Sequence, residues 1–486
     1  MWESKRIHTF ALTKPPHGTL AEWLGTGLQN RIQQFDSARY LQLLIIPPQS
    51  GINCLTAISD IPVYTKGQHL LSHHIGIILL AIILSANNVY ALKASTLPYA
   101  PATNDTTVEF VNFYPGADVY QLEGHSALRI TTPNEDIAVT WGMFDFDQPN
   151  FVYRFVKGET DYWVAAVNWR PFLHSYIDEG RRVVSHRLDL TSEQKRRLID
   201  LIGNNLAPQN RVYRYNYVLD NCATRPLSIV EQAIGDSIIL GSAPGALDGD
   251  VSFRDIMRFY HEAYPWYQFG IDLALGSGID YTLNNREKSF APVILDRQLT
   301  QATVNGRPLV SHTTVINDTP PDNAILPPTP WYLHPITICW GILALIILVA
   351  IRDVRRMTIT RWVYALMFTI YGATGLITAF LVFISEHYAT SPNWLLVWLN
   401  PLALIVPITI WFKRLNHVLT WYMTINCILL LLLMPAWPLL SQSTNSAFWP
   451  LISGDIILSG VYAYIRHKTS INSTNLTPPN NRVSNK

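Results

Sequence analysis

Cys222 is the residue whose type and surroundings best suit covalent chemistry. It lies in the segment Asp220-Asn-Cys222-Ala-Thr-Arg225, and the apolar residues that follow recur at helical spacing, with Pro226 in the first turn. Free N–H groups at a helix N-terminus stabilise a thiolate, the nucleophilic form of cysteine, and Arg225 adds a nearby cation. The pattern therefore indicates a candidate nucleophile.

A cysteine nucleophile needs a general base, and His125 is the best candidate. It follows Gly124 at the start of a predicted strand, where a glycine lets another segment approach closely. His174, His186 and His261 have no comparable setting, and we interpret them as surface or packing histidines. From spacing alone, the cysteine could also be a small buried apolar residue and the histidine a structural one.

Other chemistries have weaker support in the sequence. A lone cysteine and histidine without a second cysteine, and without an HExxH motif, leave too few ligands for zinc, so no metal is predicted. A phosphate-cradling glycine loop is also missing, and no cofactor is predicted. The net charge of +1 and the lack of a basic run give no reason to expect a nucleic-acid partner.

The elements around these residues predict a mixed α/β domain over residues 105–240. Alternating apolar residues predict strands at 108–113, 126–131 and 137–141, with Pro133-Asn134 as the turn between the last two. Thr191 followed by Gln194 is typical of a capping box that opens a helix running to about Asn205.

The C-terminal half has the composition of a membrane domain. Hydrophobic residues make up 49% of the chain and charged residues 15%, below the share of about 25% in soluble domains. Five apolar segments, each near the length of about 20 residues that a spanning helix needs, follow one another at 334–351, 362–384, 394–412, 418–439 and 449–465. We therefore expect an all-α membrane domain of about five transmembrane helices over 334–467.

The loops between these segments alternate in charge, which predicts their orientation. The loops at 352–361 and 413–414 and the end after 465 carry Arg and Lys, whereas 385–393 and 441–446 carry none. Because basic loops stay in the cytoplasm, residues 95–333 are expected in the periplasm and the tail 468–486 in the cytoplasm.

The N-terminal part predicts export. Residues 66–91 resemble a signal peptide, with an apolar core of about ten residues that is too short to span a bilayer. Residues 1–65 show no periodicity, and we interpret them as a mis-called start or an unstructured extension. Since Cys54 precedes the signal and Cys339 and Cys427 lie in apolar segments, Cys222 is the lone exported thiol.

The sequence resembles the Lnb N-terminal periplasmic domain family, named for a bacterial lipoprotein N-acyltransferase. The resemblance covers most of residues 105–405. Its most specific motifs are Gly124-His125-Ser-Ala-Leu-Arg129 and Asp220-Asn-Cys222-Ala-Thr-Arg225. Further pieces are Trp141-Gly-Met-Phe-Asp-Phe146, Asn210-Arg211-Val-Tyr213, Ser385-Glu-His387, Asn393 and Asn400-Pro401.

The resemblance implies an α+β, permuted papain-like exported domain at 95–320, ahead of the membrane domain. It also implies a cysteine acyltransferase that takes a fatty acyl chain from a membrane phospholipid as a Cys222 thioester and passes it to the amine of a diacylglyceryl lipoprotein. His125 would be the base. Asp145, shortly after the strand that follows His125, is our hypothesis for an orienting third residue.

Substrate binding is assigned to Asn221 and Arg225 beside the nucleophile and to His387 and Asn393 in the outward-facing loop. Two alternatives stay open: a membrane-tethered cysteine hydrolase, such as a peptidase or peptidoglycan amidase, and a non-enzymatic membrane component for binding or transport. Asp455, a carboxylate within the last apolar segment, is explained equally well by function and by a hydrogen bond between helices.

Overall fold

The computed structural model describes residues 105–320 and 327–475, with side chains up to residue 470. These residues belong to one compact unit that begins at Pro101. The expectations for 1–65 and for the signal peptide at 66–91 lie outside the described residues.

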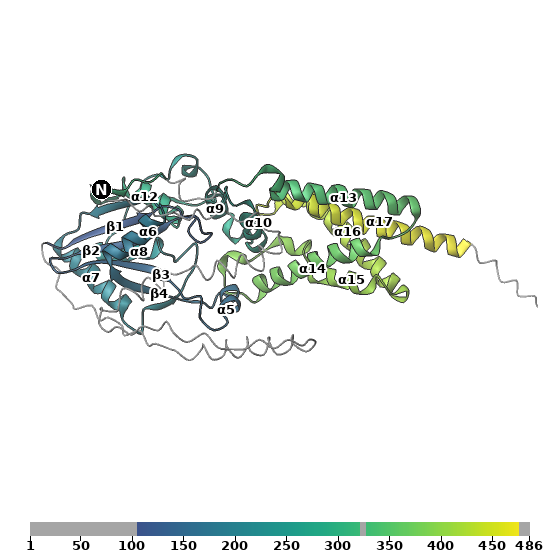
Figure 1. Ribbon diagram of the computed structural model, residues 1–486, viewed down its shortest axis with the longest axis horizontal. Helices are drawn as coiled ribbons and strands as arrows, with labels where there is room; N and C mark the ends of the chain where they lie inside the picture. The colour runs from purple at the N-terminus through teal and green to yellow at the C-terminus, as the bar shows by residue number, and fades with distance from the viewer. Residues whose placement is uncertain (1–104, 321–326, 476–486) are drawn as a thin grey trace, which may run out of the picture. The chain divides into compact units, whose positions relative to one another are not determined.

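Seven strands of the described chain form one antiparallel sheet (Figure 1). Its order is β6-β4-β3-β2-β1-β5-β9. The strands are β1 (Thr107–Phe113), β2 (His125–Thr131), β3 (Asp136–Met143), β4 (Asp161–Asn168), β5 (Val183–Leu188), β6 (Val212–Arg214) and β9 (Val310–Asn317), and a separate hairpin holds β7 (Thr303–Val304) and β8 (Arg307–Pro308). The three strands predicted from alternation are confirmed as β1, β2 and β3.

Eight α-helices accompany the strands in the described residues before the membrane segments. They are α5 (Phe151–Lys157), α6 (Trp169–Asp178), α7 (Ser192–Leu206), α8 (Thr224–Ile234), α9 (Phe253–Tyr260), α10 (Pro265–Ala274), α11 (Asn285–Lys288) and α12 (Pro292–Leu299). The capping box of α7 is confirmed, because Thr191 accepts from the Gln194 N–H and the Gln194 side chain accepts from the Thr191 N–H. The soluble part is therefore an α+β domain.

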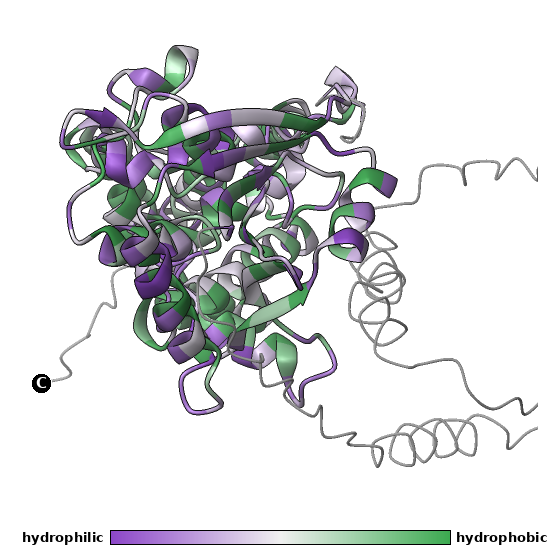
Figure 2. Cartoon of the chain, turned by 90° about the vertical axis from the view of Figure 1, so that its left-hand side faces the viewer, coloured by the Kyte–Doolittle hydropathy of each residue, from purple (hydrophilic) through white to green (hydrophobic). Residues whose placement is uncertain are grey.

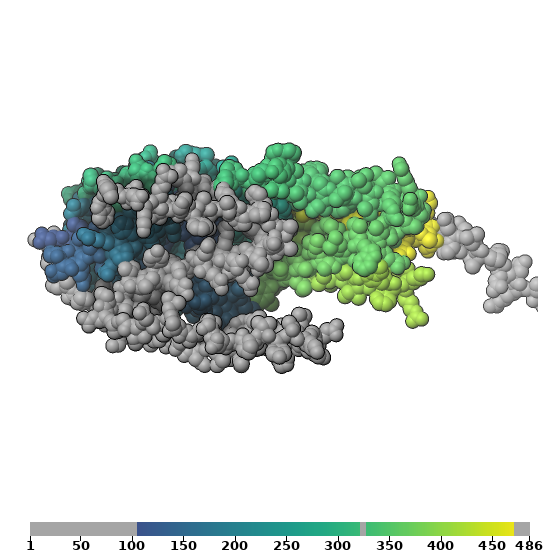
Figure 3. All heavy atoms as spheres, viewed as in Figure 1, coloured from purple at the N-terminus to yellow at the C-terminus, as the bar shows by residue number. Residues whose placement is uncertain are grey.

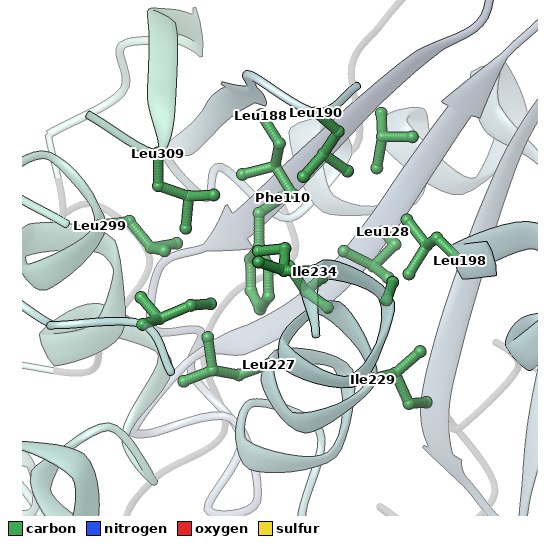
Figure 4. Close-up of a cluster of buried hydrophobic side chains, with 14 of the residues drawn as sticks. Phe110, Leu128, Leu188, Leu190, Leu198, Leu227, Ile229, Ile234, Leu299 and Leu309 are labelled. Atoms are coloured by element: carbon green, nitrogen blue, oxygen red, sulfur yellow. The ribbon is translucent and has the colours of Figure 1, made fainter. Parts of the chain in front are cut away.

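The sheet is covered on both faces. Successive residues of a strand point to opposite faces, and β1 buries both sets: Val108 and Phe110 pack with α7, α8 and α12, whereas Val111 and Phe113 pack with α6. Figure 4 shows the first core, in which Phe110 and Leu128 of the sheet meet side chains of α7 and α8. Hydrophilic and hydrophobic residues mix along these elements in Figure 2, as expected of partly exposed strands and helices.

Four helices in the described residues are long and apolar enough to cross a membrane. They are α13 (Pro335–Arg356), α14 (Arg361–Phe383), α16 (Asn416–Ala436) and α17 (Phe448–Asn475). Helix α17 packs against both α13 and α16, and in Figure 3 the green and yellow atoms of these segments lie in direct contact. The chain is a multi-pass membrane protein with a periplasmic domain.

The third expected segment, 394–412, differs from the other four. It is broken into the 3₁₀-helices η8 (Trp394–Val397) and η9 (Pro401–Leu404) and the short helix α15 (Ile405–Thr409). The break follows from Pro401, since proline cannot donate its backbone hydrogen bond. Trp394 lies at the outer end, where its N–H donates to Gln442, and Trp411 lies at the inner end against Trp362. The segment still runs from one side of the bundle to the other.

Two glycines of α14 let this broken segment approach closely. A Cβ at Gly375 would lie 2.4 Å from the Leu399 carbonyl oxygen, and one at Gly372 would lie 2.7 Å from Leu404 Cγ. Irregular backbone is tolerated within a bilayer only where protein covers it. The two glycines therefore let α14 approach closely enough to cover the irregular backbone of the break.

Asp455 takes part in a hydrogen-bonded cluster between two membrane helices. Its Oδ1 accepts from Asn426 Nδ2 of α16 at 2.8 Å and from Ser459 Oγ of α17 at 3.0 Å. These bonds give Oδ1 two partners inside the bundle, so the structural explanation of Asp455 has direct support.

The outer loops of the bundle bind the periplasmic domain. The Glu386 N–H donates to the Lys157 carbonyl at 2.8 Å, at the end of α5. In the second loop Asn445 donates to Asp272 at 2.9 Å. Asp272 also pairs with the fully buried Arg254 at 3.0 Å and with Arg258 at 3.1 Å. The two parts are thus joined by buried charge-assisted hydrogen bonds as well as by the chain itself.

Candidate active site

Cys222 lies two residues before the first residue of α8, as the helical spacing predicts. Asn221 holds this turn: its Oδ1 accepts from the N–H groups of Ala223 and Thr224 at 2.8 and 3.0 Å, and its Nδ2 donates to the carbonyls of Tyr217 and Phe290. Asn221 is buried. Its side chain caps the helix and fixes the cysteine, while its assigned role in substrate binding stays a prediction.

Hydrogen-bond donors surround the Cys222 sulfur. The backbone of Ser126, the backbone of Cys222 itself and the Tyr215 hydroxyl each lower the pKa of the thiol, but burial outweighs them and raises that pKa above its usual value of 9.0. The sequence led us to expect a thiol activated by the helix end and by a cation. In the structure the thiol is buried, so it is protonated at neutral pH and needs a base.

Arg225 does not provide the expected cation at the sulfur. Its Nε and Nη2 donate to the Asp220 carboxylate at 2.8 and 2.5 Å, and its guanidinium carbon lies 3.6 Å from the centre of the Tyr213 ring. The charge of Arg225 is therefore balanced by Asp220, and burial governs the thiol.

His125 is the first residue of β2, as predicted. The preceding Gly124 has a φ of 88°, and a Cβ there would lie 2.4 Å from the Phe113 carbonyl oxygen. His125 Nε2 lies 2.7 Å from the Thr140 hydroxyl on the neighbouring strand. With Nε2 donating to Thr140, Nδ1 is the nitrogen that can accept a proton.

The environment of His125 keeps its imidazole neutral. Burial, with a smaller contribution from the positive charge of Arg181, lowers the pKa of His125 from 6.5 to about 3. The Tyr176 ring lies nearly parallel to the imidazole at 6.1 Å, and the Arg181 guanidinium lies 4.6 Å from the centre of that ring. A neutral imidazole at pH 7 is the form that can act as a general base.

The start of the strand that carries the histidine lies beside the cysteine at one end of the sheet. Ser126, which follows His125, hydrogen-bonds through its backbone to the Cys222 sulfur. Strand β3 changes register between Thr140 and Met143, and within this bulge Gly142 has a φ of 88°. A Cβ at Gly142 would lie 3.0 Å from Tyr215 Cε2 and 3.8 Å from Cys222 Cβ, so the bulge lets β3 approach the Tyr215 ring beside the cysteine.

The other assigned residues lie elsewhere. The Asp145 carboxylate accepts from the Asp147 N–H at 2.9 Å within its own loop. His387 Nε2 lies 2.7 Å from the Phe155 carbonyl oxygen, and Asn393 donates to the Leu273 carbonyl at 3.0 Å. His387 and Asn393 thus lie at the junction of the two domains, and the roles proposed for all three stay predictions.

The three histidines that we interpreted as surface or packing residues have such surroundings. His174 is exposed on α6. His186 is buried and lies 2.7 Å from Asp296, and His261 is buried between Glu123 and Gln268 at 2.7 Å from each. In the residues that the structure describes, no three His, Cys, Asp or Glu side chains come together as a possible metal site.

Sequence reasoning missed Thr140 and Tyr215, which contact the two central residues. Thr140 could have been found as the polar residue within the apolar run Ile137-Ala-Val-Thr140-Trp141. Tyr215 lies in a loop seven residues before the cysteine, and no local pattern distinguishes it from the tyrosines around it.

Comparison with known families gives one match to each of the two parts of the chain. The family model for the Lnb N-terminal periplasmic domain matches residues 100–246, and the one for the Lnb transmembrane domain matches residues 328–470. Together they cover more than half of the chain. The chain belongs to the Lnb family. Cys222 and His125 fall within the match to the Lnb periplasmic domain, whereas helices α9–α12 lie between the two Lnb matches. No curated protein and no solved structure matches the chain significantly.

Proposed function

We propose that this protein is a cysteine-dependent acyltransferase at the periplasmic face of the cytoplasmic membrane, with Cys222 as nucleophile and His125 as base. The observation that carries the proposal is a buried thiol just before α8 that lies beside the backbone of Ser126, the residue that follows a neutral histidine at the start of β2. Membership of the Lnb family supports acyl transfer over other cysteine chemistry.

The first half-reaction transfers an acyl group to the sulfur. His125 Nδ1 takes the Cys222 proton, and the thiolate attacks the ester carbonyl of a phospholipid. The N–H groups of Ser126 and Cys222 donate to the oxyanion. When the ester C–O bond breaks, the imidazolium returns its proton to the leaving alkoxide. The products are a Cys222 thioester and a lyso-phospholipid.

The second half-reaction passes the acyl group to an amine. The α-amino group of a diacylglyceryl lipoprotein attacks the thioester and forms an amide, and His125 takes the proton that the nitrogen loses. As the C–S bond breaks, this proton returns to the sulfur and restores the thiol. A thioester suits this step because it reacts with amines more readily than an oxygen ester does.

For the orienting role we favour Thr140 over Asp145, because Thr140 contacts the imidazole. Asn221 acts on the nucleophile by capping α8. Arg225, His387 and Asn393 are proposed to bind substrate through contacts that form only with lipid present.

Purified full-length protein in phospholipid vesicles, given a diacylated lipopeptide, is expected to yield lyso-phospholipid and N-acylated lipopeptide in equal amounts. Cys222→Ser and His125→Ala should lower turnover by several orders of magnitude, since each removes the covalent route. His174→Ala, on the exposed face of α6, is the matched control. Lyso-phospholipid with free fatty acid and no acylated peptide would instead indicate a hydrolase.

A further inference from the structure

Helix α5 exposes a group of large apolar side chains beside the membrane domain. Val152, Tyr153 and Phe155 are 63%, 55% and 46% exposed, which is unusual for three neighbours on one soluble helix. The Tyr153 ring lies 6.2 Å from that of Phe380 on α14, and the Phe155 ring lies 6.1 Å from that of His387. This apolar surface is continuous with the outer end of a membrane-spanning helix.

The outer end of α14, which α5 contacts, indicates where α5 lies relative to the bilayer. Phe383 and Ile384, which end α14, are 77% and 53% exposed. The end of a spanning helix lies where the hydrocarbon core meets the interface, whatever side chains it carries. Since α5 contacts this same end, its exposed side chains lie at the level of the outer leaflet.

A row of aromatic rings leads from α5 into the periplasmic domain. Its successive rings are Phe155, Phe151, Phe144, Tyr162 and Tyr215, with centre-to-centre distances of 5.8, 5.9, 5.2 and 4.6 Å. We name these five residues the aromatic row. None of the five is fully buried, and none belongs to the buried hydrophobic clusters of the described residues. The row is therefore not part of the core that stabilises the fold.

The aromatic row ends at the nucleophile. The Tyr215 oxygen accepts from the Cys222 N–H at 3.4 Å, and its hydroxyl hydrogen-bonds to the sulfur. The bulge glycine Gly142 lies against the same ring: a Cβ there would lie 3.0 Å from Tyr215 Cε2. The row thus connects the membrane surface with the atom that would react.

We propose that the aromatic row is an acyl-chain subsite. The hydrocarbon chain of an outer-leaflet lipid lies along Phe155, Phe151 and Phe144, and its carbonyl carbon reaches the sulfur beside Tyr215. The inference rests on the proposed function for the position of the carbonyl, but the contact between row and lipid does not depend on turnover. Aromatic rings offer a large apolar surface at little cost in side-chain entropy.

Photocrosslinking tests the contact directly. Full-length protein carrying Cys222→Ala and p-benzoylphenylalanine in place of Phe151 or Phe144 is reconstituted in phosphatidylethanolamine–phosphatidylglycerol vesicles with radiolabelled acyl chains. Light should transfer label to both positions. The same group in place of Ile239, an exposed apolar residue outside the row, is the control and should stay unlabelled.

Other outcomes would overturn the proposal. Label at neither position would exclude a lipid contact. Label at position 151 but not at 144 would show that the lipid stops at the membrane surface. A crosslink to a second copy of the protein would show that protein covers the row. Label at both positions, together with no acyl transfer to any acceptor by the protein that keeps Cys222, would leave the subsite standing and reject the proposed function instead.

Dependence on chain length separates a subsite from a packing role. Phe144→Ala and Phe151→Ala should raise KM at least tenfold for long-chain donors and change it less than twofold for short-chain donors. Ile239→Ala should change neither value. An equal loss for both donor lengths would identify these rings as structural and overturn the proposal.

Discussion

At the scale of single residues, burial determines the chemistry of the pair. Burial raises the pKa of the Cys222 thiol and lowers that of the His125 imidazole, so both groups are neutral at pH 7. The pair thus differs from a preformed thiolate–imidazolium pair, in which the charges are already separated. Proton transfer has to accompany attack on the substrate.

This resting state can be measured by alkylation of the thiol. Only the thiolate reacts, and burial places its pKa above 9.0, so the rate with iodoacetamide should be low at pH 7 and rise through pH 9 and beyond. The Cys222→Ser protein, measured in parallel, gives the background from the other cysteines. A rate that is already maximal at pH 7 would contradict the prediction.

The contact between Thr140 and His125 gives a second prediction at this scale. Thr140→Val keeps the shape of the side chain but removes its hydroxyl, so the ring loses its partner at Nε2. We expect kcat to fall by about 10- to 100-fold with little change in KM, a smaller loss than the factor of about 10²–10⁴ that general-base catalysis contributes as a whole.

Thr140→Ser keeps the hydroxyl and should restore most of the activity. Equal activities of the Val and Ser proteins would show that Thr140 only fills space.

At the scale of elements, the position of the cysteine depends on the end of α8. The helix begins without a capping side chain at Ala223, and Asn221 supplies the cap from two residues further back. The same side chain reaches the Phe290 carbonyl, far along the chain. One amide thus fixes both the helix end and the loop that carries the nucleophile.

Asn221→Ala should therefore destabilise the domain. It removes the side chain that caps α8 at a buried site, and the loss of such a cap costs about 2 kcal/mol. For a domain of this size the thermal midpoint should fall by about 4–8 °C, followed by near-UV circular dichroism. Gln209→Ala, at an exposed amide, is the control. An unchanged midpoint would contradict the capping role.

The elements that the sequence predicts are those with strong local patterns. Alternation in β1–β3 and the capping box of α7 are local signals, and the structure confirms them. Strands β5 and β9 join the sheet across more than 120 residues of chain, and the contact between Thr140 and His125 depends on strand register. Neither this strand pairing nor this side-chain contact has a local signature in the sequence. The break at 394–412 was missed because hydropathy ignores the effect of Pro401 on backbone hydrogen bonds.

At the scale of the whole molecule, the charge of the loops predicts the orientation of the bundle. A reporter fused after Lys486 should read as cytoplasmic and one inserted near Asn323 as periplasmic, because the basic loops stay inside. A reporter inserted near Arg355 serves as the cytoplasmic control. Finding the sites at 323 and 486 on the same side would exclude a bundle that crosses the membrane an odd number of times.

The junction between the two parts has a consequence for substrate selection. Asp272, fully buried and paired with Arg254, binds the domain to the second outer loop, and the end of α5 binds the first. With two attachments the domain cannot swing freely, so the thiol stays at a constant height above the bilayer. The junction therefore sets the distance from the bilayer at which a substrate can react. A reacting group that lies deeper in the bilayer, or that extends further from it, does not reach the thiol.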